Sequence, residues 1–268
     1  MNSFDNYATN MSKLFVKGRT LVLAYDHGME HGPSKDFNLS NSQPEFIFDI
    51  AEKTKINGVV TQIGVAEKYS SSFNVPLIIK LNGKTELGRE MISRQVCSVK
   101  RASKLNPIAV GYTIYPGSYY ESVMFNELSK IIEEAHDYGL PVVVWSYPRN
   151  KDYSINDLST DVLAYAARVA LELGADVVKL KFNNDIEGFK WVVHNAGRVK
   201  VVVAGSSRSD PNRFLHSIVD ALKAGASGAF IGRNIWQSEE PFKVVEALKD
   251  LIFNYEDPDR AYERYFKE

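Results

Sequence analysis

The chain has 268 residues, of which 44% are hydrophobic and 24% are charged, and its formal net charge is −1 at pH 7. This length can enclose one large hydrophobic core, so a single domain over residues 1–268 is expected. The near-zero net charge argues against nucleic acid and membrane surfaces as partners, because both usually require a basic excess. Small molecules and further copies of the chain are the expected partners.

The single cysteine, Cys97, excludes an internal disulfide framework and a multi-cysteine metal site. The first twenty residues are too polar for a signal peptide. No stretch approaches the roughly 18 apolar residues that a membrane-spanning helix needs. We therefore expect a soluble, cytoplasmic protein.

Short apolar runs recur along the chain, and amphipathic stretches with helical spacing separate them. The runs lie at residues 21–25, 59–63, 76–81, 108–114, 141–147, 176–182, 200–204 and 228–231. The helical patterns lie at residues 44–53, 120–138, 160–173, 211–224 and 241–253. Buried strands that alternate with helices are typical of a parallel sheet, and eight such units in about 250 residues predict a TIM (β/α)8 barrel.

Two segments lie outside this pattern, an additional N-terminal helix at residues 4–16 and a short, tyrosine-rich C-terminal tail. The structural alternative is a doubly wound open sheet, which would place a G-x-G-x-x-G loop after the first strand. Residues 26–32 read DHGMEHG instead, so the barrel is favoured.

Polar residues concentrate where the predicted strands end, which is where the active site of a TIM barrel is built. They lie at or just after the ends of the first, fifth, sixth, seventh and eighth strands: Asp26 and His27, then Trp145, Tyr147 and Arg149, then Lys179 and Lys181, then residues 204–208, then Gly232 and Arg233. We therefore expect an acid, a phenol, two lysines and two small-residue loops at one mouth.

Lys179 and Lys181 stand two residues apart in an apolar strand, so both side chains point to one face. A lysine becomes a nucleophile near neutral pH when burial or a neighbouring cation destabilises its ammonium. Lys181 is interpreted as that neighbour of Lys179. Such a lysine can form a Schiff base with a ketone; the alternative is that both lysines simply reach water.

Tyr147 is a candidate proton carrier, because a nearby protonated lysine would stabilise its phenolate. Asp26 could hold the lysine ammonium or polarise a substrate hydroxyl. The alternatives are an aromatic residue at the rim for Tyr147 and a loop-capping carboxylate for Asp26.

His27 and His31 could bind phosphate or sugar hydroxyls, or could be structural. Their H-x-x-x-H spacing invites a metal site, but a third ligand is missing from the pattern, and no metal or cofactor is expected. The loops after strands seven and eight form the usual phosphate site of such barrels, and residues 234–236 suggest a short helix there. Two ordinary glycine turns are the alternative.

Six sequence blocks run in order from the first strand to the eighth: LAYDHGMEHGP, LIIKLNGKTEL, AVGYTIYPGS, VVVWSYPR, LELGADVVKLKF and IGRNIWQ. In these blocks the chain resembles the archaeal-type class I fructose-bisphosphate aldolases. The resemblance implies a metal-independent Schiff-base enzyme of glycolysis and gluconeogenesis. It would split fructose 1,6-bisphosphate reversibly into dihydroxyacetone phosphate and glyceraldehyde 3-phosphate. A large homo-oligomer such as a decamer is also implied.

The resemblance also assigns roles to residues. Lys179 would form the Schiff base and Tyr147 would be the general acid and base, with Asp26 and Trp145 completing the catalytic set. Substrate would be bound by His27, His31, Arg149 and Lys181 and by the loops at Ala204, Gly205, Ser206, Gly232 and Arg233.

The chain departs from the family pattern in two places, and both bear on phosphate binding. Ser206 stands where glycine is usual, and residues 182–184 read FNN where Tyr-Thr-Gly is common. One rival is a Schiff-base enzyme for another sugar phosphate, such as a 2-amino-3,7-dideoxyheptulosonate synthase, but those relatives lack a Trp-Ser-Tyr fifth strand. A non-catalytic sugar-phosphate-binding barrel is the rival from another class.

Overall fold

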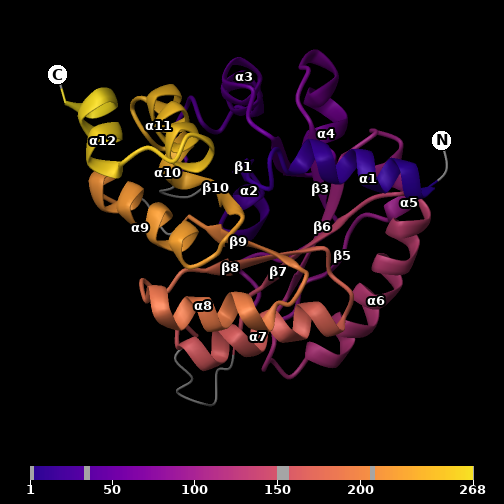
Figure 1. Ribbon diagram of the computed structural model, residues 1–268. Coiled ribbons are helices and arrows are strands. Elements are labelled where there is room, and N and C mark those ends of the chain that lie inside the picture. The colour runs from indigo at the N-terminus through magenta and orange to yellow at the C-terminus, as the bar shows by residue number, and fades with distance from the viewer. Residues whose placement is uncertain (1–2, 33–36, 150–156, 206–208, 268) are drawn as a thin grey trace.

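The computed structural model describes residues 3–32, 37–149, 157–205 and 209–267. Eight parallel strands close into a barrel in the order β1-β10-β9-β8-β7-β6-β3-β2, and helices surround them (Figure 1). The strands are β1 (Thr20–Ala24), β2 (Gly58–Gln62), β3 (Leu77–Lys80), β6 (Ala109–Ile114), β7 (Val142–Ser146), β8 (Val177–Lys181), β9 (Lys200–Ala204) and β10 (Gly228–Ile231). All eight predicted strands are confirmed, and closure of β1 onto β10 excludes the open sheet.

The five predicted helices are present within one or two residues of their expected ends. They are α3 (Pro44–Thr54), α6 (Glu121–Asp137), α7 (Thr160–Glu172), α9 (Pro211–Lys223) and α11 (Pro241–Phe253). Three of them, α3, α9 and α11, begin with proline at the first position, where a missing N–H costs no hydrogen bond. Further helices are α2 (His27–Glu30), α4 (Ile63–Tyr69), α5 (Val99–Ser103), α8 (Ile186–Asn195) and α10 (Arg233–Trp236), and a 3-10 turn, η1, spans Ser70–Ser72.

The inside of the barrel has its own apolar core, separate from the one between strands and helices. The predicted N-terminal helix is confirmed as α1 (Ser3–Leu14), and Leu14 and Phe15 belong to this inner core. Trp145 belongs to it as well, on the strand that ends at Ser146. The carboxyl ends of the strands therefore stand on a filled barrel, which holds side chains there in fixed positions.

The C-terminal segment is a helix, α12 (Pro258–Phe266), rather than the tail expected from the sequence. The Asp257 side chain caps it by accepting from two backbone N–H groups, and Arg264 and Tyr265 both bind Asp250 of α11. A two-stranded antiparallel ribbon, β4 (Asn82–Gly83) with β5 (Arg94–Gln95), also follows β3.

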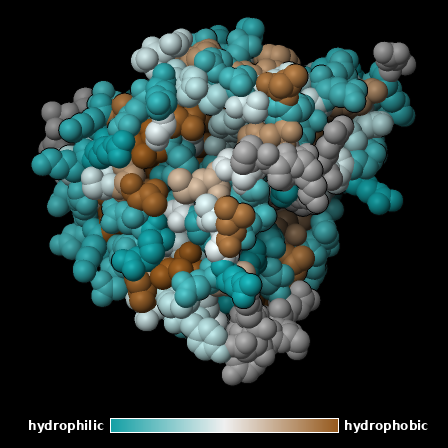
Figure 2. Space-filling model, turned by 180° about the vertical axis from the view of Figure 1, so that it is seen from behind, coloured by the Kyte–Doolittle hydropathy of each residue, from teal (hydrophilic) through white to brown (hydrophobic). Residues whose placement is uncertain are grey.

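The face of the molecule shown in Figure 2 is mainly hydrophilic, with separate groups of hydrophobic residues. Over the described residues, every helix is too short or too polar to cross a membrane.

Candidate active site

The carboxyl ends of several strands bring titratable side chains together at one mouth. Asp26 follows β1, Lys80 ends β3, Lys179 lies in β8 and Tyr147 follows β7. Asp26, Lys80 and Lys179 are 6%, 1% and 5% exposed, respectively. A cluster of charges with so little access to water has strongly perturbed proton affinities, and such clusters mark functional sites.

Lys179 has the properties of an amine nucleophile. It pairs with Trp145 in the β7–β8 register, and its Nζ lies 5.4 Å from the centroid of the Trp145 ring. Burial lowers the pKa of Lys179 from 10.5 to about 8; Asp26 and Glu30 oppose this effect, and Lys80 and Arg233 add to it. A substantial share of this lysine is therefore uncharged slightly above neutral pH.

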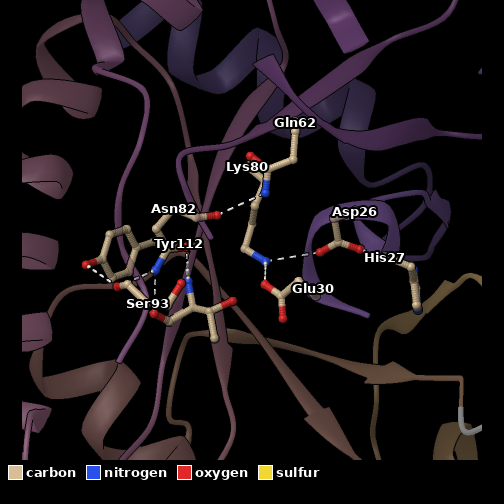
Figure 3. Close-up of polar contacts among 9 residues, drawn as sticks. Asp26, His27, Glu30, Gln62, Lys80, Asn82, Ser93 and Tyr112 are labelled. Atoms are coloured by element: carbon tan, nitrogen blue, oxygen red, sulfur yellow. Dashed lines mark hydrogen bonds and ion pairs between the residues drawn. The ribbon is translucent and has the colours of Figure 1, made fainter. Parts of the chain in front are cut away.

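The neighbouring cation is Lys80, and the interpretation of Lys181 in that role is wrong. Lys80 Nζ donates to Asp26 Oδ2 at 3.0 Å and to Glu30 Oε1 at 3.3 Å (Figure 3). Its side chain is 1% exposed. Although burial lowers it, the pKa of Lys80 is raised overall by Glu30 and Asp26, so this lysine stays an ammonium.

Sequence reasoning did not identify Lys80, Glu30 or their ion pairs. A signal was present, because Lys80 interrupts the apolar run at residues 76–81 just as Lys179 interrupts the run at residues 176–182. Glu30 is placed by the short helix α2, which the sequence pattern did not predict. The structure therefore adds a buried cation with two carboxylates to the predicted set.

Asp26 holds the Lys80 ammonium, whereas one interpretation of the sequence has it hold the Schiff-base lysine. Burial raises the pKa of Asp26, but Lys80, His27 and Lys179 outweigh it, so the pKa falls well below its usual range. Asp26 is thus a carboxylate at neutral pH, available to accept from a substrate hydroxyl.

The expectation that a lysine would favour the phenolate of Tyr147 is wrong. Burial, followed by the charges of Asp26 and Glu30, raises the pKa of Tyr147 well above 10. The resting phenol is therefore protonated, and its first step can only be to donate.

Both buried lysines lie against the Trp145 ring. Lys80 Nζ lies 4.5 Å from its ring centroid, which is closer than Lys179 Nζ at 5.4 Å. The ring fits because Gly111 of β6 lies against it: a Cβ there would stand 2.3 Å from Trp145 Cζ3. Its Nε1 is buried and has no hydrogen-bond partner among the described residues.

His27 and His31 lie at the same mouth, with ring centroids 5.5 Å apart. Burial lowers the pKa of His27 to about 4, so it is neutral and can donate or accept a hydrogen bond. His31 Nδ1 lies 2.5 Å from Glu86 Oε1, nearer the surface. Within the described part of the chain, no three His, Cys, Asp or Glu side chains are grouped so as to hold a metal ion.

Arg149 and Lys181 meet at the rim of the mouth. Arg149 Nη1 donates to Asp157 Oδ2 at 2.8 Å, and Lys181 Nζ donates to the same oxygen at 3.0 Å. Two cations held on one carboxylate form a local positive site outside the buried cluster.

The loops after β9 and β10 approach each other across the last two strands. Ala204 ends β9, and the Gly205 N–H donates to Phe230 O of β10 at 3.4 Å. A Cβ at Gly232 would lie 2.6 Å from His27 Cε1 and 2.9 Å from Ala24 O, so this position needs glycine. Arg233 then begins the predicted short helix α10, whereas Ser206 lies outside the described residues. Phosphate binding here stays a prediction.

Comparisons with known proteins point to one family of enzymes. Residues 20–238 match the family model described as DeoC/LacD family aldolase. The chain is 45% identical to the class 1 fructose-bisphosphate aldolase of Thermoproteus tenax, over 92% of this chain and 95% of that protein.

Two solved structures are similar in fold and sequence. One is a Schiff-base-forming fructose-1,6-bisphosphate aldolase studied through its reaction intermediates (TM-score 0.87, 43% identity, covering 92% of this chain and 100% of that one). The other is an archaeal fructose-1,6-bisphosphate aldolase whose catalytic lysine is covalently bound to the carbinolamine intermediate (TM-score 0.86, 43% identity, covering 92% and 99%).

Proposed function

Because the chain belongs to the DeoC/LacD family of aldolases, we propose that it is a class I fructose-bisphosphate aldolase that needs no metal. It cleaves fructose 1,6-bisphosphate reversibly to dihydroxyacetone phosphate and glyceraldehyde 3-phosphate. The observation that carries the proposal is Lys179, a buried amine with a pKa of about 8 at the carboxyl end of a barrel strand.

In the proposed reaction the neutral amine of Lys179 adds to the C2 ketone and forms a carbinolamine. Tyr147 donates its proton to the departing hydroxyl, which leaves as water, and an iminium and a phenolate result. The new positive charge is close to Tyr147 and stabilises that phenolate, which the resting site does not.

Cleavage then uses the iminium as an electron sink. The Tyr147 phenolate takes the C4 hydroxyl proton, the C3–C4 bond breaks, and glyceraldehyde 3-phosphate leaves behind an enamine. Tyr147 returns the proton to C3, then takes one from the water that hydrolyses the iminium. Dihydroxyacetone phosphate and free Lys179 are released, and Asp26 orients the substrate hydroxyls throughout.

The phosphate groups are proposed to bind at two places. One is formed by the loops at Ala204, Gly205, Gly232 and Arg233, together with Ser206. The other is formed by Arg149 and Lys181, where a phosphate can replace the Asp157 carboxylate as the anion between two cations. His27 and His31 are proposed to contact the part of the substrate that lies between the two phosphate sites.

Borohydride reduction with fructose 1,6-bisphosphate, followed by peptide mass spectrometry, tests the proposal. We expect a substrate-dependent adduct on Lys179, and loss of both adduct and turnover in Lys179→Met. The matched control is Lys190→Met, in which a half-exposed lysine of α8 is removed and adduct and turnover should persist.

Each other outcome points to a named alternative. An adduct with another sugar phosphate but none with fructose 1,6-bisphosphate would favour a related synthase. Binding of fructose 1,6-bisphosphate without adduct or cleavage would favour a non-catalytic barrel. Turnover by Lys179→Met would overturn the Schiff-base assignment.

We also propose that residues 1–268 form one domain that works as a homo-oligomer, such as a decamer, in cytoplasmic glycolysis and gluconeogenesis. Exposed aromatic side chains on neighbouring helices, Tyr165 of α7 and Trp191 of α8, support self-association, since aromatic residues are enriched in interfaces. Size-exclusion chromatography with light-scattering detection would measure the molar mass of the particle and therefore the number of subunits.

A further inference from the structure

Two lysines are buried at the mouth, and the proposed function uses only one of them. Lys80 is more deeply buried than Lys179, and both contact the same indole. Removing an ammonium from water is costly unless it is paired and hydrogen-bonded. Lys80 is paired with two carboxylates, Asp26 and Glu30, so the buried cluster contains one cation fully committed to two anions.

The groups that face Lys179 come from every side of the mouth. Carboxylates Asp26 and Glu30 favour its ammonium, and cations Lys80 and Arg233 oppose it. The neutral groups near the cluster are His27, Tyr115 and Tyr147. Lys181, on the same strand, is paired with Asp157 at the rim.

Without Lys80 this balance would reverse. Asp26 would be left as a buried carboxylate and Glu30 as a partly exposed one, both without their shared cation, and Lys179 would be the remaining buried amine able to neutralise them. A buried charge left without its partner is strongly destabilising, so Lys179 would keep its proton throughout the neutral range.

We propose that Lys80 is a positioning residue for the Schiff-base lysine: by holding Asp26 and Glu30 in ion pairs, it leaves the Lys179 amine unpaired and nucleophilic. The inference rests on the proposed function and deepens it, because it divides two buried lysines into a permanent cation and a reactive amine. Lys80 forms no bond to substrate in this role.

The test is the pH dependence of Lys179 reactivity, measured by mass spectrometry of the Lys179 peptide. Two probes are used, borohydride trapping with fructose 1,6-bisphosphate and acetylation by acetic anhydride, which requires no aldolase activity. In the wild type the midpoint is expected near the Lys179 pKa of about 8. Lys80→Met should move it upward by one unit or more, so reactivity at pH 7 falls about tenfold and recovers above pH 10.

Lys80→Arg keeps the charge and should retain a midpoint near that of the wild type. Glu30→Gln changes the balance in the other direction, because it removes one carboxylate and leaves Lys80 with one partner. Its midpoint should fall below that of the wild type. This variant also keeps the inference testable if Lys80→Met does not fold.

The outcomes separate this inference from the proposed function. If a folded Lys80→Met protein loses reactivity equally at all pH values, Lys80 only supports the local geometry of the site, and this overturns the inference. An unchanged midpoint in Lys80→Met or an upward shift in Glu30→Gln also overturns it. If the wild type is acetylated at Lys179 but never trapped with sugar bisphosphate, the substrate assignment fails, while the acetylation midpoints still decide the role of Lys80.

Discussion

Tyr147 is the side chain whose proton the proposed reaction moves in each step from dehydration of the carbinolamine to hydrolysis of the iminium. Replacing it with phenylalanine keeps the ring that packs against both apolar cores and removes only the hydroxyl. We expect Tyr147→Phe to reduce the rate of cleavage about 10²- to 10⁴-fold, the usual contribution of a positioned acid or base. Steady-state turnover and single-turnover trapping of Lys179 would measure it, and trapping should be slowed because carbinolamine dehydration also needs this proton.

Tyr115 provides the matched comparison for this prediction. It is a second buried tyrosine of the mouth, and its pKa is raised above 10 by burial and by Glu30. Tyr115→Phe should cost much less than Tyr147→Phe, since the reaction assigns it no proton. Equal losses in the two variants would mean that the two phenols share the transfer.

Gly111 of strand β6 leaves space for the Trp145 indole of the neighbouring strand β7. Because Cβ atoms this close to another atom are not tolerated, Gly111→Ala must displace the Trp145 ring, which contacts both buried lysines. We expect a loss of stability of about 1–3 kcal/mol from overpacking, together with slower trapping of Lys179. Urea unfolding followed by tryptophan fluorescence, alongside the trapping rate, measures both effects.

A glycine with free space gives the control for that substitution. A Cβ at Gly64, in α4, would meet no atom within 4 Å. Gly64→Ala should therefore leave trapping unchanged and stabilise the helix by up to about 1 kcal/mol. If Gly111→Ala behaved like Gly64→Ala, the indole would not be held by β6.

The elements that could be predicted from the sequence are those with a local signal. The apolar residues Val177, Val178 and Leu180 predict strand β8, and Lys179 stands out because it is a charged residue within that run. Helix α8 was missed, since Gly188 interrupts its pattern; the Asp185 side chain caps it by accepting from the Gly188 N–H at 2.9 Å.

The pairing of the site's charges could not be predicted in the same way. Lys80 and Asp26 are 54 positions apart and meet only because β3 and the end of β1 lie in one closed barrel. The direction of the Tyr147 pKa shift likewise depends on burial and on the carboxylates of a short helix, α2, rather than on the nearby lysine that the sequence displays.

At the opposite end of the barrel, helix α1 is hydrogen-bonded to residues next to the end of α6 and the start of β8. Asp176 accepts from Tyr7 Oη at 2.6 Å and lies 2.9 Å from His136 Nε2, and Asn10 Nδ2 donates to Gly139 O at 2.9 Å. The hydrogen bond to Asp176 raises the pKa of His136 above 6.5, although burial opposes it. Protonated His136 thus helps to hold helix α1 against the rest of the protein, through Asp176.

Since the folded pKa is raised, this contribution is fully present below the unfolded pKa of about 6.5 and is lost as the pH rises through the folded value. The His136 side chain is 40% exposed, so the effect should stay below about 1 kcal/mol. We expect His136→Gln to destabilise the protein at pH 6 more than at pH 9, as measured by urea unfolding at both values. Asn10→Ala, which removes an uncharged contact of the same helix, should cost the same at both; an equal pH dependence in the two variants would contradict the role of His136.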